Sequence, residues 1–576
     1  MQFMGLFYAR DPRAMLPGRE APYYIIGRHA LSATDCASDG GAIASAQGRL
    51  RNSAALRAAL GSGGIKPVDG SLSALVLAAY RLWGDEYPAR LGGPVSSVVI
   101  DQDAGRLILS RDRMGEMPVF YAYRGGSMAF SDHPAKLLDA PLATRAVDRD
   151  GLCELFGVGP ARTPGRTPFR DIFSLPPGST LIAVSHGHKV RRYFALEPLP
   201  HEDDLPRTIE TVRYLCEQAV ADILPLRPAS MLSGGLDSTT LTALMARAMN
   251  RPVESYSVDY EENERYYAPV AFQPERDAPY VTLASEHLGT NHHAVTLKQE
   301  ELMASLDEAM ALRGFPGMAD IDAALMLFAR HIAHEHPAAV SGECGDEVFG
   351  GYPWFQRPEL IARDGFPWSG SLELRERVLK PKVRDKLRLA EYASARYHEA
   401  VAALPRLTGD APEEARLRQL QNLCFQWFMP NLQERATRMS PIPVLTPYAD
   451  DRLVQYVYNV PWRMKNTGGV EKGLLREAMR DLLPENLLMR RKSPFPKTCH
   501  PRYTHLVREA TLAMLDDTSS PILEVVSADA VREIAAGPLS PAETPWFGQL
   551  MAGPQMLAYL LTVNRWMLRY NAEVTL

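Results

Sequence analysis

The sequence lacks three features that would place it in a specialised class of protein. Its 576 residues contain only six cysteines, and no two of them form a Cys-x-x-Cys pair, so neither a disulfide framework nor a zinc site is indicated. The longest apolar stretches, such as residues 75–80 and 556–563, are too short to span a bilayer. The N-terminal segment has no basic stretch followed by an apolar core, so we expect no membrane anchor and a cytoplasmic location.

The chain also has no large excess of either charge. Its 63 basic and 68 acidic residues give a formal net charge of -5, so no basic face for nucleic acid is indicated. The short basic run Arg490-Arg491-Lys492 is by itself typical of a solvated surface. The hydrophobic fraction of 46% is that of an ordinary globular protein, and the length exceeds what one hydrophobic core holds, so we expect at least two domains.

Two regions differ in their patterning. Residues 1 to about 195 are rich in short apolar runs separated by turn residues, such as 97–101 and 106–110, which predicts hairpins, with one helix near 71–83. The Pro-rich, acidic segment 197–206 is the predicted linker. Beyond it, helical periodicity alternates with short β-like runs at 229–232, 255–258 and 338–340, which favours a parallel sheet with helices on both faces. We therefore predict domains at 1–198 and 207–576.

The segment Ser233-Gly-Gly-Leu-Asp-Ser238 follows an apolar run and precedes a predicted helix. Glycines allow the backbone to approach an anion, and a helix N-terminus offers unpaired N–H groups. Asp237 cannot bind phosphate itself, but it suits a Mg²⁺ that phosphate oxygens share. No Gly-Lys-Ser/Thr follows, so this is not a Walker A loop. The pattern resembles the SGGxDS loop of enzymes that split ATP between the α- and β-phosphates, and the alternative is a glycine-rich strand-to-helix turn without a ligand.

A second glycine-rich segment, SGECGDEVFGGY at 341–352, follows the run at 338–340. It carries Glu343, Asp346 and Glu347 within five residues, and such a cluster is costly unless a cation offsets its charge. An acidic helix N-terminus would explain the acids without a ligand. Their place after a predicted parallel strand, where ligands of open α/β sheets bind, favours a Mg²⁺-pyrophosphate site instead.

Together these motifs resemble the class B, glutamine-dependent asparagine synthetases over nearly the whole chain. The resemblance is most specific at residues 341–355, 256–260, 272–274, 277–279, 471–476 and 491–498. It implies an N-terminal Ntn-like α/β/β/α sandwich and a C-terminal adenine nucleotide α-hydrolase domain. In this family a carboxylate is activated by ATP and Mg²⁺ as an acyl-adenylate, pyrophosphate leaves, and an amine then displaces AMP.

The resemblance also implies roles for individual residues. Glu343 would contact the substrate and handle the amine proton, and Lys492 would stabilise charge on the adenylate and the tetrahedral intermediate. The β-lactam synthetases, which resemble this fold, carry Tyr at the position of Glu343, which argues against β-lactam closure here. The remaining implied ligands are Leu232, Val258, Ser341 and Gly342 for adenine and ribose, Ser233, Gly234, Gly235, Asp237 and Ser238 for pyrophosphate, Lys472 for the ATP phosphates, and Asp237 and Asp346 for Mg²⁺.

The N-terminal region departs from the glutaminases of that family, whose nucleophile is an N-terminal cysteine. No cysteine precedes Cys36, the family's Asn-Gly-Glu stretch reads Gln47-Gly48-Arg49, and the acid that grips glutamine's α-amine falls near Leu72. The turn at 175–178 and the segment 111–118 still fit the scaffold. We therefore expect a retained structural domain that does not hydrolyse glutamine.

The resulting prediction is an ATP- and Mg²⁺-dependent, AMP-forming amide synthetase that acts on a specialised metabolite or a peptide. Three alternatives stay open: a lasso-peptide macrolactam cyclase, an ammonia-dependent asparagine synthetase and a catalytically silent regulator. Expected partners are a small-molecule or peptide carboxylate and an amine donor. A precursor peptide with leader-handling proteins and a homodimer are compatible with this prediction, whereas nucleic acid is not expected.

Overall fold

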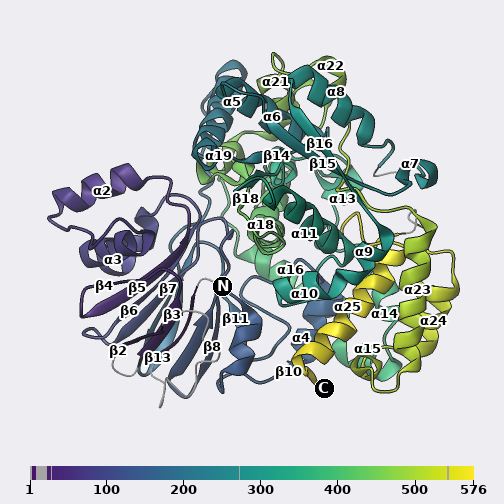
Figure 1. Cartoon of the computed structure of the whole chain (residues 1–576), viewed down its shortest axis with the longest axis horizontal. Helices are drawn as coiled ribbons and strands as arrows, with labels where there is room; N and C mark the ends of the chain where they lie inside the picture. Colours follow the sequence, from purple (N-terminus) through teal and green to yellow (C-terminus); the bar gives the residue numbers. More distant parts are fainter. Residues whose placement is uncertain (1–2, 8–22, 27–28, 271–272, 541–543) are drawn as a thin grey trace. The chain divides into compact units, whose positions relative to one another are not determined.

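The computed structural model describes residues 3–7, 23–26, 29–270, 273–540 and 544–576. The chain forms two compact units (Figure 1): unit 1 comprises Met1–Glu154, Arg162–Ala195 and Tyr570–Leu576, and unit 2 comprises Leu155–Ala161 and Leu196–Arg569. The C-terminal segment belongs to unit 1 because β19 (Glu573–Thr575) pairs in parallel with β10 (Ala146–Asp148). One of the expected motif positions, Phe272, lies outside the described residues.

Unit 1 is a sandwich of two antiparallel six-stranded sheets. The first has the order β11-β8-β9-β1-β3-β2, and its strands are β1 (Phe3–Phe7), β2 (Tyr23–Ile26), β3 (His29–Ala33), β8 (Phe120–Arg124), β9 (Ser127–Ser131) and β11 (Phe173–Ser174). The second has the order β13-β12-β7-β6-β5-β4, and its strands are β4 (Ala37–Ser38), β5 (Ala42–Gly48), β6 (Val95–Asp101), β7 (Arg106–Ser110), β12 (Ser179–Val184) and β13 (Gly187–Arg192).

The alternation of side chains along β6 builds the layers of unit 1. Val98 and Ile100 pack in the core between the two sheets, whereas Val99 packs in the core on the opposite face, beneath α2 (Ser53–Ser62) and α3 (Leu72–Trp83). The Ser71 side chain caps α3 by accepting a hydrogen bond from the backbone of Ala74. The predicted β6–β7 hairpin, the helix near 71–83 and the Ntn-like sandwich are confirmed.

Unit 2 contains a five-stranded sheet in which every pair is parallel. Its order is β16-β15-β14-β17-β18, from strands β14 (Ala229–Met231), β15 (Glu254–Tyr260), β16 (Asn291–Leu297), β17 (Ala339–Val340) and β18 (Val444–Leu445). The chain moves outward from β14 to β16 and then returns to the other side of β14 for β17. The carboxyl ends of β14 and β17 therefore form a topological switch point, where open α/β sheets bind ligands.

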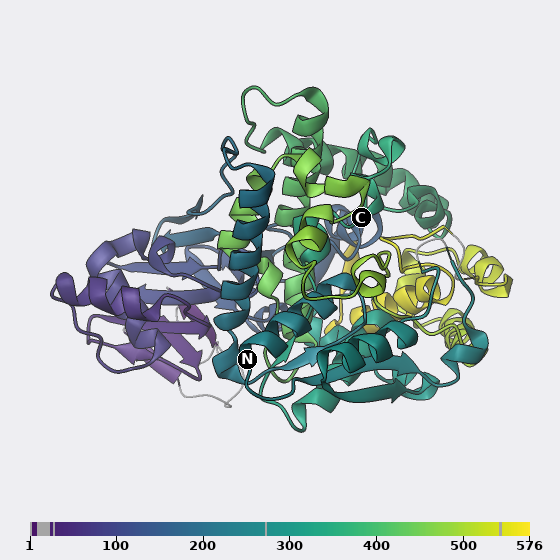
Figure 2. The ribbon, with the colours of Figure 1, turned by 90° about the horizontal axis from the view of Figure 1, so that it is seen from above.

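Helices surround this sheet, as the alternating pattern predicts. α5 (Leu205–Ala221) and α8 (Ala278–Leu288) both pack on α6 (Leu236–Ala248), which follows β14 (Figure 1). The C-terminal helices α23 (Pro501–Asp516), α24 (Ala528–Ala536) and α25 (Pro554–Tyr570), yellow-green to yellow, lie together at one side of unit 2 in both views (Figures 1 and 2). In the part of the chain that is described, no helix has both the length and the apolar character needed to cross a membrane.

Candidate active site

The first loop of the site joins β14 to α6. Ser233 and Ser238 close it, because their hydroxyl oxygens lie 2.9 Å apart and the backbone N–H of Ser233 donates to Oγ of Ser238 at 3.1 Å. Gly234 has a φ of +69°, and a Cβ atom there would lie 2.6 Å from the backbone carbon of Tyr280. Only glycine fits this position, and the loop leads directly into the N-terminus of α6.

The second loop leaves β17 and leads into the short helix α12 (Gly345–Phe349). Two of its glycines pack directly against the first loop: a Cβ atom at Gly342 would lie 2.8 Å from the backbone nitrogen of Ser238, and one at Gly345 would lie 2.7 Å from Oδ1 of Asp237. The glycines of the second motif therefore bring its carboxylates beside the predicted pyrophosphate loop.

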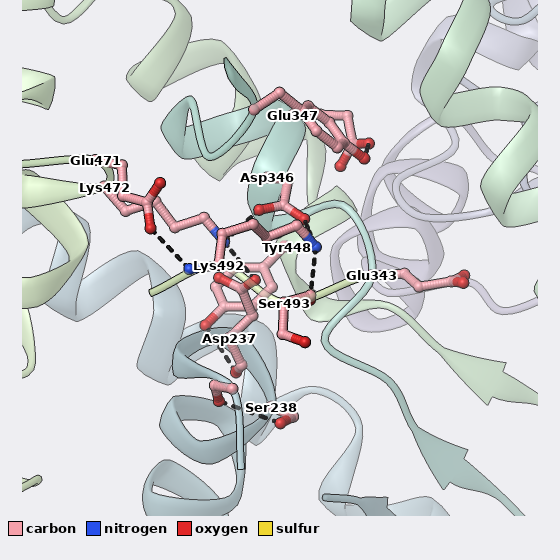
Figure 3. Close-up of polar contacts among 12 residues, drawn as sticks. Asp237, Ser238, Glu343, Asp346, Glu347, Tyr448, Glu471, Lys472, Lys492 and Ser493 are labelled. Atoms are coloured by element: carbon pink, nitrogen blue, oxygen red, sulfur yellow. Dashed lines mark hydrogen bonds and ion pairs between the residues drawn. The ribbon is translucent and has the colours of Figure 1, made fainter. Parts of the chain in front are cut away.

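Two lysines and two carboxylates form a compact charge cluster between these loops (Figure 3). Nζ of Lys472 lies 2.5 Å from Oδ2 of Asp237 and 2.5 Å from Oδ1 of Asp346. Nζ of Lys492 lies 2.7 Å from Oδ2 of Asp346. The carboxylate of Glu471 accepts a hydrogen bond from the backbone N–H of Lys492 at 2.8 Å, which fixes the backbone at Lys492.

The cluster alters the protonation equilibria of its members. Burial by itself would raise the pKa of Asp346, but the ammonium groups of Lys472 and Lys492 outweigh it and hold that pKa at about 2. Burial, reinforced by the Asp346 carboxylate, raises the pKa of Asp237 although Lys472 opposes the shift. Burial disfavours the charged form of Lys472, yet its two carboxylate neighbours raise its pKa above the ordinary value. Lys472 and Asp346 therefore remain charged at neutral pH.

Glu343 faces away from this cluster (Figure 3). Its Oε1 forms an ion pair with the Nη2 of Arg435, from α18 (Met429–Arg438). Its Oε2 is buried and has no hydrogen-bond partner among the described residues. Glu343 thus presents one oxygen held by a guanidinium and one oxygen without a protein partner at the edge of the charge cluster.

The residues present fit Mg²⁺. Oδ1 of Asp237 is buried without a hydrogen-bond partner among the described residues, and Asp237 and Asp346 already share one cationic group. No group of three or more His, Cys, Asp or Glu side chains suited to a metal occurs in the described parts of the chain. Mg²⁺ commonly takes one or two carboxylates and completes its shell with phosphate oxygens and water, which these two aspartates would allow.

One cavity of about 280 Å³ within unit 2 unites nearly all of the residues expected from the sequence. Those that line it are Leu232, Ser233, Gly235, Asp237, Ser238, Val258, Ser341, Gly342, Glu343, Asp346, Lys472 and Lys492. Gly234 is the exception, because its backbone packs on Tyr280.

The sequence interpretation of Arg490 as a surface residue is wrong. The side chain of Arg490 is 1% exposed, forms an ion pair with Asp277 and donates from Nη1 to the backbone carbonyl of Ser233 at 2.9 Å. Its guanidinium also lies 4.2 Å from the ring centroid of Tyr280. Arg490 therefore supports the Ser233–Ser238 loop through the Ser233 carbonyl. A basic triplet carries no local signal that its first member is buried.

Sequence reasoning also missed Arg435 and Tyr352. The hydroxyl of Tyr352 donates to Oε1 of Glu347 at 2.6 Å, and burial together with the Asp346 charge raises the pKa of Glu347 to about 7. The Tyr352 ring lies 5.9 Å from Nζ of Lys492. Glu347 is thus tied to a tyrosine in the wall of the cavity, whereas Asp346 faces the lysines.

In unit 1, the residues that replace the family's glutamine-binding groups contact other residues of the same unit. Nη2 of Arg49 lies 3.1 Å from Oε1 of Glu116, which is buried. Leu72 packs against the core beneath α3. Burial raises the pKa of the thiols of Cys36 and Cys153, the cysteines of this unit, to about 12, so both are protonated at neutral pH.

Comparisons with known proteins match two separate parts of the chain to two family descriptions. The family description "Asparagine synthase" matches residues 211–568, and "Glutamine amidotransferase domain" matches residues 35–194. The chain is 38% identical to "Asparagine synthetase [glutamine-hydrolyzing] 3" of Bacillus subtilis (strain 168), over 92% of this chain and 87% of that protein. It is 25% identical to a "Putative asparagine synthetase [glutamine-hydrolyzing]" of Mycobacterium bovis, over 75% of this chain and 71% of that protein.

Proposed function

Because this chain belongs to the asparagine synthetase family and is an ATP-dependent amide-forming ligase, we propose that unit 2 activates a carboxylate with ATP and Mg²⁺ and passes the acyl group to an amine that does not come from glutamine. The observation that carries this proposal is the cluster of Asp237, Asp346, Lys472 and Lys492 between the two glycine loops at the switch point. A triphosphate is polyanionic, and this cluster pairs fixed ammonium groups with carboxylates that suit a divalent cation.

The proposed reaction has two steps. An oxygen of the substrate carboxylate attacks the α-phosphorus of ATP, and the bond to the β-phosphate oxygen breaks, so that pyrophosphate leaves from the Ser233–Ser238 loop. The amine then attacks the carbonyl carbon of the acyl-adenylate, and the bond to AMP breaks. Bound to Asp237 and Asp346, Mg²⁺ would screen the negative charge of the phosphates. Lys492, held by the Glu471 contact, is placed to stabilise charge that develops on the acyl and phosphate oxygens.

Glu343 is the proposed acceptor of the amine proton. Its Oε2 has no protein partner among the described residues, while Arg435 holds the other oxygen. A general base must lie within hydrogen-bond reach of the proton it takes, and a carboxylate fixed by a guanidinium loses little orientational freedom when the substrate binds. Arg435 is therefore a positioning residue in this proposal.

We propose that the chain does not hydrolyse glutamine, and the residues of unit 1 support this. Arg49 stands where the family pattern has an acid, and its partner is the internal Glu116. The protonated thiols of Cys36 and Cys153 are poor nucleophiles. The relatives are named as glutamine-hydrolysing enzymes, so a glutaminase assay of the full chain decides the point. We expect glutamate release at the rate of the reaction without enzyme.

Exchange of labelled pyrophosphate into ATP tests activation. We expect exchange that requires both Mg²⁺ and a carboxylic acid, and loss of that exchange in the Asp237→Ala variant. A catalytically silent regulator would fold normally and give no exchange with any acid or peptide.

Ammonia-dependent formation of asparagine remains the second candidate function because the relatives are named asparagine synthetases. Mass spectrometry of products from aspartate and ammonia tests it. A specialised-metabolite or peptide substrate, including one cyclised as a macrolactam, is part of the same proposal, and precursor-dependent release of AMP would identify it.

A further inference from the structure

The cavity has a second half that the nucleotide and the charge cluster do not explain. Beyond Glu343 its wall comes from α11 (Asp320–Ala333), from the π-helical segment η6 (Cys424–Phe428) with α18, and from two tryptophans. We name this part the acyl chamber and define it by six lining residues: Leu325, Phe328, Trp354, Trp368, Phe428 and Leu432.

Helical spacing explains why these side chains face one space. Leu325 and Phe328 are three residues apart on α11, and Phe428 and Leu432 are four residues apart along the continuous η6–α18 segment, so each pair shares a helix face. The rings of Trp368 and Phe428 stack with their centroids 5.2 Å apart, and those of Trp354 and Tyr352 stack at 4.2 Å. The aromatic wall is therefore continuous from Tyr352, beside Lys492, to Phe428.

Charge is scarce on this side of the cavity. Glu343 and Arg435 stand at the boundary of the acyl chamber, and they form an ion pair with each other. Glu347 is turned to the hydroxyl of Tyr352. Free aspartate would bring an α-ammonium and a second carboxylate next to its reacting group. Both charges would have to leave water, and the two charged side chains at this boundary are already paired with each other.

The geometry points to a hydrophobic carboxylic acid as the acyl substrate, whose ring-sized or branched apolar group occupies the acyl chamber while its carboxylate lies beside Lys492. This inference rests on the proposed function, since it assigns the acid that unit 2 activates. The chamber adjoins Lys492 through the Tyr352 ring, so an acyl group joined to the α-phosphate has this apolar space directly ahead of it. Burial of one phenyl-sized group corresponds to roughly 10- to 100-fold in binding.

The test is pyrophosphate exchange by the full chain with 3-phenylpropanoate, propanoate and L-aspartate as alternative acids. We expect kcat/KM for 3-phenylpropanoate to exceed that for propanoate and for L-aspartate by roughly 10- to 100-fold. Equal or better exchange with L-aspartate or propanoate would overturn the inference and leave the proposed function standing. No exchange with any of the three acids would also overturn the inference, whereas no exchange with any acid or peptide would overturn the proposed function as well.

A variant that fills the acyl chamber tests whether the acid or the amine occupies it. Leu432→Phe, at a half-buried position, should lower exchange with 3-phenylpropanoate at least about tenfold more than it lowers exchange with propanoate. Leu568→Phe adds the same ring at a position that is 50% exposed and should change neither. Leu432→Phe could instead leave exchange unchanged for both acids and raise the KM for the amine, measured from AMP release. In that case the chamber holds the amine, and the assignment to the acid is wrong.

Discussion

Each unit of this chain contains a buried carboxylate beside basic side chains, yet the two carboxylates titrate in opposite directions. In unit 2, Asp346 lies between Lys472 and Lys492, and these outweigh burial to hold its pKa at about 2. In unit 1, Glu116 faces the partly exposed Arg49, and burial raises the pKa of Glu116 to about 7 despite that partner. Two fixed ammonium groups maintain a charged site, whereas one partly solvated guanidinium does not offset the desolvation of its partner.

Under the proposed function, this difference separates a unit that retains its chemistry from one that retains only its scaffold. The charge cluster of unit 2 would place cations and carboxylates where a nucleotide and a divalent cation need them. In unit 1, Arg49 and Glu116 form an ion pair with each other, and Leu72 packs against the core. The following predictions test this contrast, beginning with the largest expected effect.

Replacement of Lys492 should abolish product formation. Lys492→Ala removes the ammonium group that we propose stabilises the reacting oxygens, and we expect kcat for amide formation to fall by roughly 1,000-fold. Lys382→Ala, at an exposed position on α15 (Pro381–Leu387), is the matched control and should retain full activity. AMP release, followed by chromatography, measures both. A Lys492→Ala enzyme within about threefold of the wild type would remove Lys492 from the mechanism.

Replacement of Asp346 should act mainly on activation. Asp346→Asn keeps the shape of the side chain but removes the charge shared by Lys472 and Lys492, and we expect pyrophosphate exchange to fall by roughly 100-fold. The exposed Asp385→Asn is the control. The Mg²⁺ concentration for half-maximal exchange should also rise in any residual activity. An unchanged Mg²⁺ dependence would place the cation elsewhere.

A single methyl group should also disturb the cluster. A Cβ atom at Gly351 would lie 2.1 Å from Oδ1 of Asp346 and 2.2 Å from Cε of Lys472. Gly351→Ala must therefore displace these side chains, and we expect exchange to fall by roughly tenfold or more while the fold is retained. Gly70→Ala in unit 1, where no atom lies within 4 Å of the new Cβ, is the control. Wild-type exchange in Gly351→Ala would show that the cluster tolerates rearrangement.

The last prediction concerns the stability of unit 1 rather than activity. The pKa of Glu116 is about 7 in the folded state against an ordinary value of 4.5, so its contribution to stability is fully present below about pH 4.5 and is lost as pH rises through 7. The loss is about 3 kcal/mol for a shift of this size. Glu116→Gln removes this titrating group. The free energy of unfolding, measured with urea, should therefore fall less in the variant than in the wild type between about pH 4.5 and about pH 8. Parallel pH profiles would contradict the burial account.

Much of unit 2 could be predicted from sequence because its motifs are local. Ser233, Asp237 and Ser238 follow one apolar run, and Glu343 and Asp346 follow another, so strand ends alone predicted where their side chains meet. Lys472 and Lys492 came from the resemblance, since nothing in their own spacing predicts that both reach Asp346.

Contacts between distant segments could not be predicted. Arg435 is 92 residues from Glu343 in the chain, and Arg490 is 257 residues from Ser233, and each is decided by tertiary packing. The acyl chamber was also missed. Its Trp-Phe pairs resemble ordinary core residues in the sequence, and only the approach of α11 to η6 and α18 places them around a space beside Glu343.

The most direct test of the account is a single reaction with ATP, Mg²⁺, an acid and two nitrogen sources. The full chain would receive 3-phenylpropanoate or L-aspartate together with amide-labelled [¹⁵N]glutamine and unlabelled ammonia, and mass spectrometry would follow the amide and glutamate. The account predicts AMP, pyrophosphate and an unlabelled amide, with glutamate no higher than without enzyme. A ¹⁵N-labelled amide formed in step with glutamate would contradict it, because unit 1 would then supply the nitrogen.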